Sequence, residues 1–361
     1  MKLLFIDDEP DNIDPAVRAL RAAGEECDVS DFHQTESKLD TFRPDIVILD
    51  LLEGPVPEQN ATGLEDYDLV WNERFCPLVV YSAHPEIVTD QYPPHPFVKS
   101  AKKGSDLTQL TTAIDALRPN VDSLRDAEKH MRKQFALAVR DVAPYAFEAY
   151  ETPADRIQAI VRSGRRRLAA LMDAELETGQ KLASWEHYIY PPIGQDLQLG
   201  DILMRVGSAK DDPDNFRLVL SPSCDLVESH ERTPKVADVL VARCCSIKDG
   251  LKLIGLQSTT SKAKLKERFS TILTQGYSDA MHPIASLVER IPCMVANLKN
   301  LELLAFAMIG TAEDQYERIA SMDSPFRELV SWSYLQVAGR PGLPDRDVAK
   351  WSDEMVLACD K

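Results

Sequence analysis

Five polar side chains in the N-terminal third each end a short apolar segment of the chain. Three are carboxylates, which repel one another if they meet at one point unless a cation lies between them. Mg²⁺ suits such a site because it takes hard oxygen ligands and keeps waters for a phosphoryl partner. A carboxylate can also attack phosphorus, and a hydroxyl and an ammonium opposite it would stabilise the transferred group. The five residues are Asp7, Asp8, Asp50, Ser82 and Lys99.

The segments that precede these residues predict parallel strands. Runs such as 45–50 and 77–82 are almost entirely aliphatic and are separated by helical patterns. Strands without polar alternation indicate a sheet covered by helices on both faces. The carboxyl ends of such strands meet at one edge, so we expect the five side chains to form one site. The predicted strands are 2–7, 26–32, 45–50, 77–82 and 96–99, followed by a closing helix over 107–117.

Residues 1–118 resemble the receiver domain of two-component response regulators. The resemblance rests on four motifs, Phe5-Ile-Asp-Asp-Glu-Pro10, Ile46-Val-Ile-Leu-Asp-Leu51, Val80-Tyr-Ser-Ala83 and Phe97-Val-Lys99. It implies a flavodoxin-like, doubly wound (βα)5 fold for residues 1–120. It also implies that Asp50 accepts a phosphoryl group from a histidine kinase. By the same resemblance Mg²⁺ is held by Asp7, Asp8, Asp50 and the backbone carbonyl of Leu52, while Ser82 and Lys99 bind the phosphoryl oxygens.

Two segments beside the predicted site depart from the receiver pattern. Asp50 and Gly63 are 13 residues apart, which is longer than usual, and Ser82 and Lys99 are 17 apart, which is shorter. Several prolines lie in the second segment and disfavour a helix interior. We therefore expect the fourth helix to be short or missing, and we do not expect ordinary dimerisation through the face that it usually forms. The prolines are Pro85, Pro93, Pro94 and Pro96.

Composition and charge exclude several classes of protein. The chain has 361 residues, of which 44% are hydrophobic and 27% charged, as is typical of globular domains. Residues 1–120 carry 10 Lys+Arg against 23 Asp+Glu, and such an acidic segment lacks the basic footprint that nucleic acid requires. No apolar run approaches the length of a membrane span. The seven scattered cysteines, without a secretion signal, predict free thiols and a cytoplasmic protein.

Residues 121–182 predict a helical connector. Pro119-Asn120 is expected to close the receiver unit, and Pro144 and Pro153 to break the helical run. The apolar spacing indicates helices that form a hairpin or pair with another subunit. The basic runs 162–167 and 262–268 are interpreted as docking sites for an acidic surface rather than for nucleic acid.

Residues 183–361 predict a mixed α+β domain. The short apolar segments 200–206, 216–221, 236–242 and 251–256 indicate a small β-barrel or sandwich. The chain after residue 261 is expected to be mostly helical, with helices over 261–273, 323–337 and 345–359. Part of 190–345 weakly resembles the small SH3-like barrel of the MazF/PemK toxin superfamily. It also resembles uncharacterised bacterial proteins associated with phage-defence loci. No catalytic pattern supports a ribonuclease.

The segment Ser221-Pro-Ser-Cys-Asp225 has two chemical interpretations and one structural one. Cys224 could be a nucleophile with His230 as its base, or both could bind zinc with Cys244 or Cys245. Neither spacing is a recognised signature. The favoured interpretation is structural, in which small residues cap buried backbone at a strand-to-turn transition.

Three hypotheses for function follow. In the first, a response-regulator-like protein takes a phosphoryl group from a histidine kinase and relays the signal to a C-terminal protein-interaction domain, within a bacterial phage-defence circuit. Its further partner would be an effector protein or a second copy bound through helices in 121–180. In the second, the protein is a phosphoryl sink. In the third, the C-terminal half is a thiol hydrolase or a nuclease.

Overall fold

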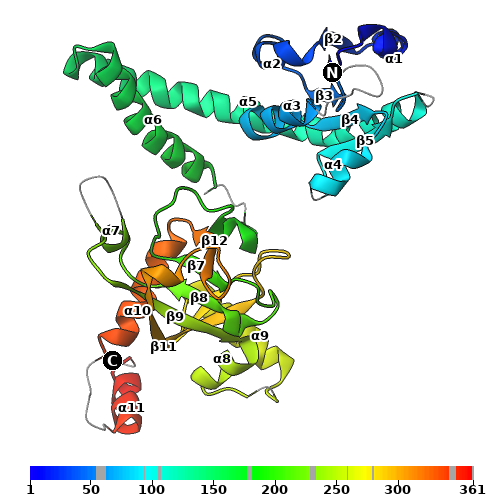
Figure 1. The fold of residues 1–361 in the computed structure, drawn as a ribbon. Helices are drawn as coiled ribbons and strands as arrows, with labels where there is room; N and C mark the ends of the chain where they lie inside the picture. The colour runs from blue at the N-terminus through cyan, green and yellow to red at the C-terminus, as the bar shows by residue number, and fades with distance from the viewer. Residues whose placement is uncertain are drawn as a thin grey trace. The chain divides into compact units, whose positions relative to one another are not determined.

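The computed structural model describes residues 1–53, 62–92, 94–104, 107–176, 181–227, 233–257, 259–278, 280–340 and 347–359. The chain forms two compact units, which we call unit 1 (Met1–Thr178) and unit 2 (Gly179–Lys361) (Figure 1). Within the described ranges, no helix combines the length and the apolar character needed to cross a membrane.

Unit 1 contains a five-stranded parallel sheet in the order β2-β1-β3-β4-β5. Alternate side chains of β1 enter different cores, because Leu3 and Phe5 pack with α1 and α5 whereas Leu4 and Ile6 pack with α2, α3 and α4. Helices thus cover both faces, and the predicted flavodoxin-like doubly wound fold is confirmed. The strands are β1 (Lys2–Ile6), β2 (Glu26–Ser30), β3 (Ile46–Leu49), β4 (Leu78–Ser82) and β5 (Val98–Lys102).

The first four helices of unit 1 are short, and the fourth is the shortest. It has six residues and ends where the proline-rich segment begins, so the expectation of a short fourth helix is confirmed. Two single-turn elements, η1 (Phe32–Gln34) and η2 (Val70–Arg74), precede α2 and follow α3. The helices are α1 (Pro10–Ala22), α2 (Thr35–Phe42), α3 (Gly63–Leu69) and α4 (Glu86–Gln91).

Strand β5 continues three residues beyond its predicted end at 99. It lies at the edge of the sheet, where Ser100 and Lys102 are exposed and Ala101 is buried. An edge strand tolerates polar side chains that a central strand would have to bury. The carboxyl end of β5 therefore lies next to Lys103 rather than at Lys99.

The helix that closes the receiver fold is much longer than predicted. Helix α5 (Thr108–Ala149) has 42 residues and passes through both Pro119 and Pro144, so the expected breaks at Pro119-Asn120 and at Pro144 are both wrong. Proline removes one backbone hydrogen bond, but Leu117 and Val121 on either side of Pro119 are buried in the sheet core and hold the helix there. Helix α6 (Pro153–Leu176) follows and packs back on α5 as a hairpin (Figure 1).

Unit 2 is built on a seven-stranded antiparallel sheet in the order β10-β11-β9-β8-β7-β12-β6. Apolar side chains form a core on each face, one including Phe216 and Val330 and the other including Val219 and Tyr316. The mixed α+β class is confirmed. The strands are β6 (Tyr188–Ile189), β7 (Asp201–Arg205), β8 (Phe216–Val219), β9 (Asp238–Ser246), β10 (Met281–Ile284), β11 (Met294–Ala305) and β12 (Tyr316–Met322).

One segment of unit 2 that was predicted to be a strand is partly helical. Residues 251–256 were expected to be β, but α8 (Ile247–Leu253) covers the first three of these six residues. The Ser246 hydroxyl accepts a hydrogen bond from the backbone N–H of Asp249, and this N-cap starts the helix. Strands β10 to β12 fall in a region that was expected to be mostly helical. The helices predicted near 261–273, 323–337 and 345–359 are present as α9 (Lys262–Gln275), α10 (Phe326–Ala338) and α11 (Val348–Cys359).

The segment Ser221–Asp225 contains a single helical turn, α7 (Ser223–Leu226), directly after β8. Ser221 Oγ accepts a hydrogen bond of 2.8 Å from the N–H of Leu240, and Ser223 Oγ accepts one of 3.0 Å from the N–H of Leu199. Both hydroxyls thus satisfy backbone groups that no strand partner reaches. The structural interpretation of this segment is confirmed.

We expect Ser221→Ala to lower the free energy of unfolding by about 1 kcal/mol, because the partly buried N–H of Leu240 would lose its acceptor, the Ser221 hydroxyl. Urea unfolding followed by circular dichroism measures this loss. Cys224→Ala is the matched control, since its thiol is exposed and accepts no backbone hydrogen bond in the described structure. Equal stability of Ser221→Ala and wild type would contradict the capping role.

Candidate functional site

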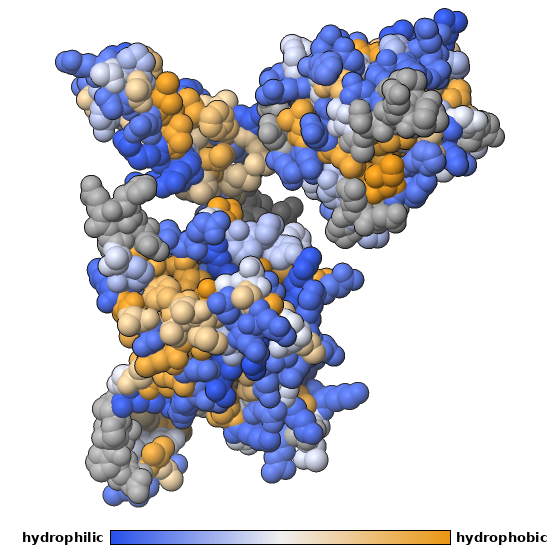
Figure 2. All heavy atoms as spheres, in the orientation of Figure 1, coloured by the Kyte–Doolittle hydropathy of each residue, from blue (hydrophilic) through white to orange (hydrophobic). Residues whose placement is uncertain are grey.

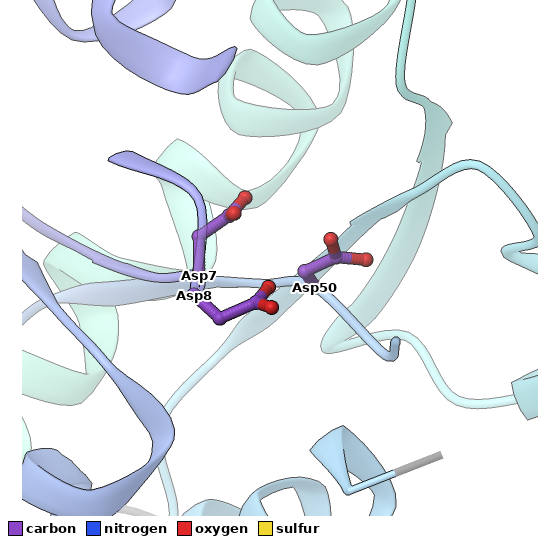
Figure 3. A group of neighbouring side chains, drawn as sticks. All are labelled: Asp7, Asp8 and Asp50. Carbon is purple, nitrogen blue, oxygen red and sulfur yellow. The ribbon is translucent and has the colours of Figure 1, made fainter. Parts of the chain in front are cut away.

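Three of the predicted site residues, Asp7, Asp8 and Asp50, meet at the carboxyl ends of β1 and β3 (Figure 3). The N–H of Asp50 donates to the carbonyl of Ile6 at 2.9 Å, which ties the end of β3 to the end of β1. The N–H of Asp7 donates to the carbonyl of Ser30 at 3.0 Å, at the end of β2. The parallel register therefore fixes the position from which each carboxylate projects.

Asp7, Asp8 and Asp50 can share one cation. Their ligand oxygens lie within 4.8 Å of one another, and no other such group of three occurs in the part of the chain that the structure describes. Opposite ligands of a Mg²⁺ ion are about 4.2 Å apart, because each Mg–O distance is about 2.1 Å. An all-oxygen set at this spacing fits magnesium. Asp7 and Asp50 are only 2% and 7% exposed, whereas Asp8 is half-buried and can face a bound ion from the solvent side.

Backbone hydrogen bonds orient two of these carboxylates. Asp7 Oδ1 accepts from the N–H of Glu9 at 3.0 Å, and Asp50 Oδ1 accepts from the N–H of Leu51 at 2.7 Å. The N–H of Leu52 lies 3.4 Å from the same Asp50 oxygen. The second oxygen of each carboxylate is left to bind other groups. The proposed role of the Leu52 carbonyl as a metal ligand stays a prediction.

The ammonium group at this site belongs to Lys103 and not to Lys99. Lys103 Nζ lies 2.6 Å from Asp7 Oδ2 and 2.6 Å from Asp50 Oδ2. Lys99 pairs with Val79, three residues before the end of β4, so the prediction of Lys99 is wrong. Ser82 and Lys103 are 21 residues apart, so the apparent shortening of this segment also disappears. The sequence signal for the correct lysine is Gly104, which follows Lys103 and has a positive φ in the turn after β5.

The charges at the site depend on one another. Burial raises the pKa of Asp7, and hydrogen bonding to Lys103 only partly offsets this effect. Burial alone would lower the pKa of Lys103, but its hydrogen bonds to Asp50 and Asp7 raise the pKa overall. Lys103 therefore remains protonated and neutralises part of the carboxylate charge.

Ser82 lies where the sequence predicted it, at the last position of β4. Its side chain is fully buried, and its carbonyl accepts a hydrogen bond of 2.8 Å from the N–H of Lys103. The Ser82 hydroxyl oxygen is 3.5 Å from the N–H of His84. The strand pairing of β4 with β5 thus places a hydroxyl beside the lysine on the same edge as the carboxylates.

Gly63 allows helix α3 to begin directly beside Asp50, because it has no Cβ atom. A Cβ atom at Gly63 would lie 2.2 Å from the carbonyl oxygen of Asp50 and 2.6 Å from the Cα of Leu51. The N–H of Gly63 donates to the carbonyl of Leu51 at 3.2 Å. The long insertion predicted between Asp50 and Gly63 lies mostly outside the described residues, at 54–61. At Gly63 the chain has returned to the carboxyl end of β3.

The chemical sites considered for unit 2 are not assembled in its described part. Cys224 is exposed, and its Sγ lies 3.5 Å from Asp225 Oδ1. His230, its expected partner, lies outside the described residues. Cys244 is buried in the sheet core, where burial raises the pKa of its thiol, and it groups with no other described ligand residues around a metal position.

Comparisons with known proteins concern the N-terminal third. Neither a protein-family model nor a curated protein sequence matches the chain. One similar solved structure is the receiver domain of the PhyR response regulator of Erythrobacter litoralis, with 19% identity and a TM-score of 0.28 over 32% of this chain and 88% of that one. A second is the N-terminal domain of a response regulator receiver protein from Methanoculleus marisnigri, with 21% identity and a TM-score of 0.24 over 32% of this chain and 93% of that one.

A third similar structure is the complex of the histidine kinase ThkA with the response regulator protein TrrA. The matched chain has 20% identity and a TM-score of 0.26 over 32% of this chain and 97% of that one. The resemblance of residues 190–345 to an SH3-like barrel finds no support in these comparisons. The fold of unit 1 is therefore assigned from its own strand order and helix layers, which are those of a receiver-type sheet.

The buried carboxyl group of Asp66 on α3 should make the stability of the folded protein depend on pH. Burial raises its pKa from 3.8 to about 6, although Thr35 donates a hydrogen bond to it. A raised folded-state pKa contributes stability below the unfolded value, and that contribution is lost as the pH rises through about 6. We expect Asp66→Asn to raise the melting temperature relative to wild type at pH 8 and to give a smaller gain at pH 4.5. Thermal melts at both pH values measure the difference.

The matched control is Glu65→Gln, which removes an exposed carboxylate from the same helix. It should change the melting temperature little at either pH. If the gain from Asp66→Asn were the same at both pH values, the buried charge would not be its cause.

Proposed function

We propose that this protein is a response-regulator-like signalling protein whose unit 1 accepts a phosphoryl group on Asp50. One observation carries the proposal. The carboxylate of Asp50 lies 2.6 Å from a lysine ammonium and shares a possible cation position with two further carboxylates at the carboxyl edge of a (βα)5 sheet. Acyl phosphate chemistry needs this combination of nucleophile, cation and counter-charge.

The phosphoryl donor that fits this site is a phosphohistidine of a histidine kinase. A carboxylate oxygen of Asp50 attacks phosphorus, an O–P bond forms, and the N–P bond breaks with its electron pair returning to the histidine nitrogen, which takes up a proton. Mg²⁺ held by Asp7, Asp8 and Asp50 would neutralise charge on the phosphoryl oxygens. The hydrogen bond from the N–H of Leu51 to Asp50 Oδ1 leaves Oδ2 as the attacking atom.

Lys103 and Ser82 are proposed to bind the phosphoryl group once it is on Asp50. Lys103 Nζ already contacts Asp50 Oδ2, so the oxygens of a phosphoryl group on that atom would lie within its reach. Its contact with Asp7 would then compete with the new contact. Lys103 follows β5 and precedes α5, which carries the hairpin, so its movement provides a route by which phosphorylation biases the connector and the protein-interaction role proposed for unit 2.

We expect wild type to acquire one phosphoryl group from acetyl phosphate in the presence of Mg²⁺ and Asp50→Asn to acquire none. Lys103→Ala should lower the level or rate of modification by about 10²-fold, the effect of removing one preorganised charged group. Intact-mass spectrometry measures the adduct. Lys99→Ala is the matched control, because this lysine lies on β5, just before Lys103 in the chain, but away from the carboxylates, and it should behave as wild type.

A modified Asp50→Asn variant would show that another residue is the acceptor. Loss of the adduct in Lys99→Ala together with its retention in Lys103→Ala would contradict the lysine assignment made from the structure.

We also expect Mg²⁺ to raise the melting temperature of the wild-type protein, because an ion that binds only the folded state stabilises it by mass action. Asp8→Asn removes one oxygen charge from the ligand set and should reduce this shift strongly. Calorimetric melts at increasing Mg²⁺ concentration measure the dependence. Asp11→Asn, an acidic residue in the first turn of α1 that is not one of the three clustered carboxylates, is the control and should keep the full shift.

A further inference from the structure

Small side chains form the seam between the two helices of the hairpin. The buried residues of α5 beyond the sheet core include Ala138 and Ala146, and those of α6 are Ala159 and Gly164. A Cβ atom at Gly164 would lie 3.9 Å from a methyl group of Val139 on α5, so the two backbones approach closely. A seam of alanine and glycine buries little apolar surface on its own.

Several large apolar side chains of the hairpin are exposed, whereas others, such as Val139 and Leu168, are half-buried. Met131 and Phe135 are four residues apart on α5, and Ile157 and Val161 are four apart on α6, so each pair shares one side of its helix. Their exposed fractions are 50%, 55%, 61% and 61%. Figure 2 shows hydrophobic side chains gathered along the hairpin. We call these four residues the hairpin face.

We propose that the hairpin face binds the hairpin face of a second copy of this chain and that the two hairpins form a four-helix bundle. The proposal does not depend on phosphorylation of Asp50. Two identical hairpins supply all four helices that such a bundle needs, and a two-fold axis makes one surface complementary to itself.

The apolar pattern of α5 supports this pairing. Its apolar positions follow alternating spacings of four and three residues, interrupted by Glu128 between Leu124 and Met131, and this is the heptad pattern of helices that pack along their length. The first four positions are buried against the sheet of unit 1, whereas Met131, Phe135 and Tyr145 in the second part are exposed on their own chain. A second hairpin would bury the exposed apolar side chains of α5, as the sheet of unit 1 buries those in its first turns. The pattern consists of Leu110, Ile114, Leu117, Val121, Leu124, Met131, Phe135, Ala138, Val142 and Tyr145.

The size of the hairpin matches what a stable dimer requires. Helix α6 has 24 residues and is therefore about 36 Å long, and two helices side by side are about 20 Å wide. The hairpin can thus cover about 700 Å² on each copy, close to the roughly 800 Å² per partner of a standard stable interface. A single bound helix would cover only part of this width.

Charge does not oppose the association of two identical surfaces. Arg132 forms an ion pair with Glu128 of the same helix, 2.5 Å apart, and Asp141 is paired with both Arg140 and Arg167. Each of these charged side chains is already paired within its own chain. Two copies can therefore meet without burying a row of unpaired like charges.

The test is the mass of the full-length chain in solution, measured by light scattering during size-exclusion chromatography and by sedimentation equilibrium. Wild type should have twice the chain mass at concentrations up to about 100 µM, which detects dissociation constants tighter than about 10⁻⁴ M. The double variant Phe135→Glu, Val161→Glu should have the mass of one chain. Both residues are exposed, so the variant should keep the helical circular dichroism and the melting transition of unit 2.

Leu273→Glu is the matched control, because it places the same charge at an exposed leucine of α9 in unit 2 and should leave the dimer intact. A wild-type protein that stays monomeric over this concentration range would overturn the proposal. So would a double variant that remains folded and dimeric, since another surface would then hold the copies together. Equal dissociation by the double variant and by Leu273→Glu would also overturn it.

Discussion

The contact of one ammonium group with two buried carboxylates is the constraint on which the rest of unit 1 depends. Two unit charges about 4 Å apart repel by about 4 kcal/mol at an effective dielectric constant of about 20. The carboxylates of Asp7 and Asp50 are subject to this repulsion at the edge of a buried sheet. Lys103 offsets it, because its ammonium group lies 2.6 Å from an oxygen of each. A phosphoryl group or a divalent cation would change this balance between repulsion and attraction, because each would compete with the present contacts between Lys103 and the carboxylate oxygens of Asp7 and Asp50. The site is thus sensitive to its ligands because its charges are nearly balanced without them.

Parallel pairing delivers these groups to one edge. β1, β3, β4 and β5 are neighbours in the sheet, so their carboxyl ends lie side by side although the residues span the chain from Asp7 to Lys103. The backbone of Gly63 lies close to Asp50 and Leu51, so α3 begins directly beside the carboxyl end of β3. A side chain at this position would push the helix away from Asp50. The geometry of the site is therefore a consequence of strand order and of one residue without a Cβ atom.

Much of unit 1 could be predicted because its central strands are nearly pure aliphatic runs and each ends in a charged or hydroxyl residue. The errors have a common physical cause, which is that tertiary packing overrides local signals. β5 lies at an edge and accepts Lys99, Ser100 and Lys102, so polar residues did not mark its end. Pro119 did not end α5 because its neighbours are held by the sheet core.

In unit 2, β11 runs from Met294 to Ala305, and its register with β9 shifts between Asn297 and Leu301, which interrupts the alternation that would have revealed it. The structural role of the segment around Cys224 also depends on long-range packing. The hydroxyls of Ser221 and Ser223 accept hydrogen bonds from backbone groups that become their neighbours only after folding.

Helix α5 links the two parts of unit 1 through a single rigid element. Its first turns, including Leu110 and Ile114, are buried against the strands that carry the site, and its second half carries Met131 and Phe135 of the hairpin face. The N–H of Lys103 is bonded to the carbonyl of Ser82, so the lysine cannot move far without disturbing the pairing of β4 with β5 just before this helix begins. A helix packed along the sheet core transmits such a displacement along its length rather than absorbing it, since close-packed interiors shift between discrete arrangements. One end of α5 is buried by the sheet, and in the proposed dimer the other end is buried by a second hairpin. A change of charge at Asp50 would therefore alter how the two chains pack against each other.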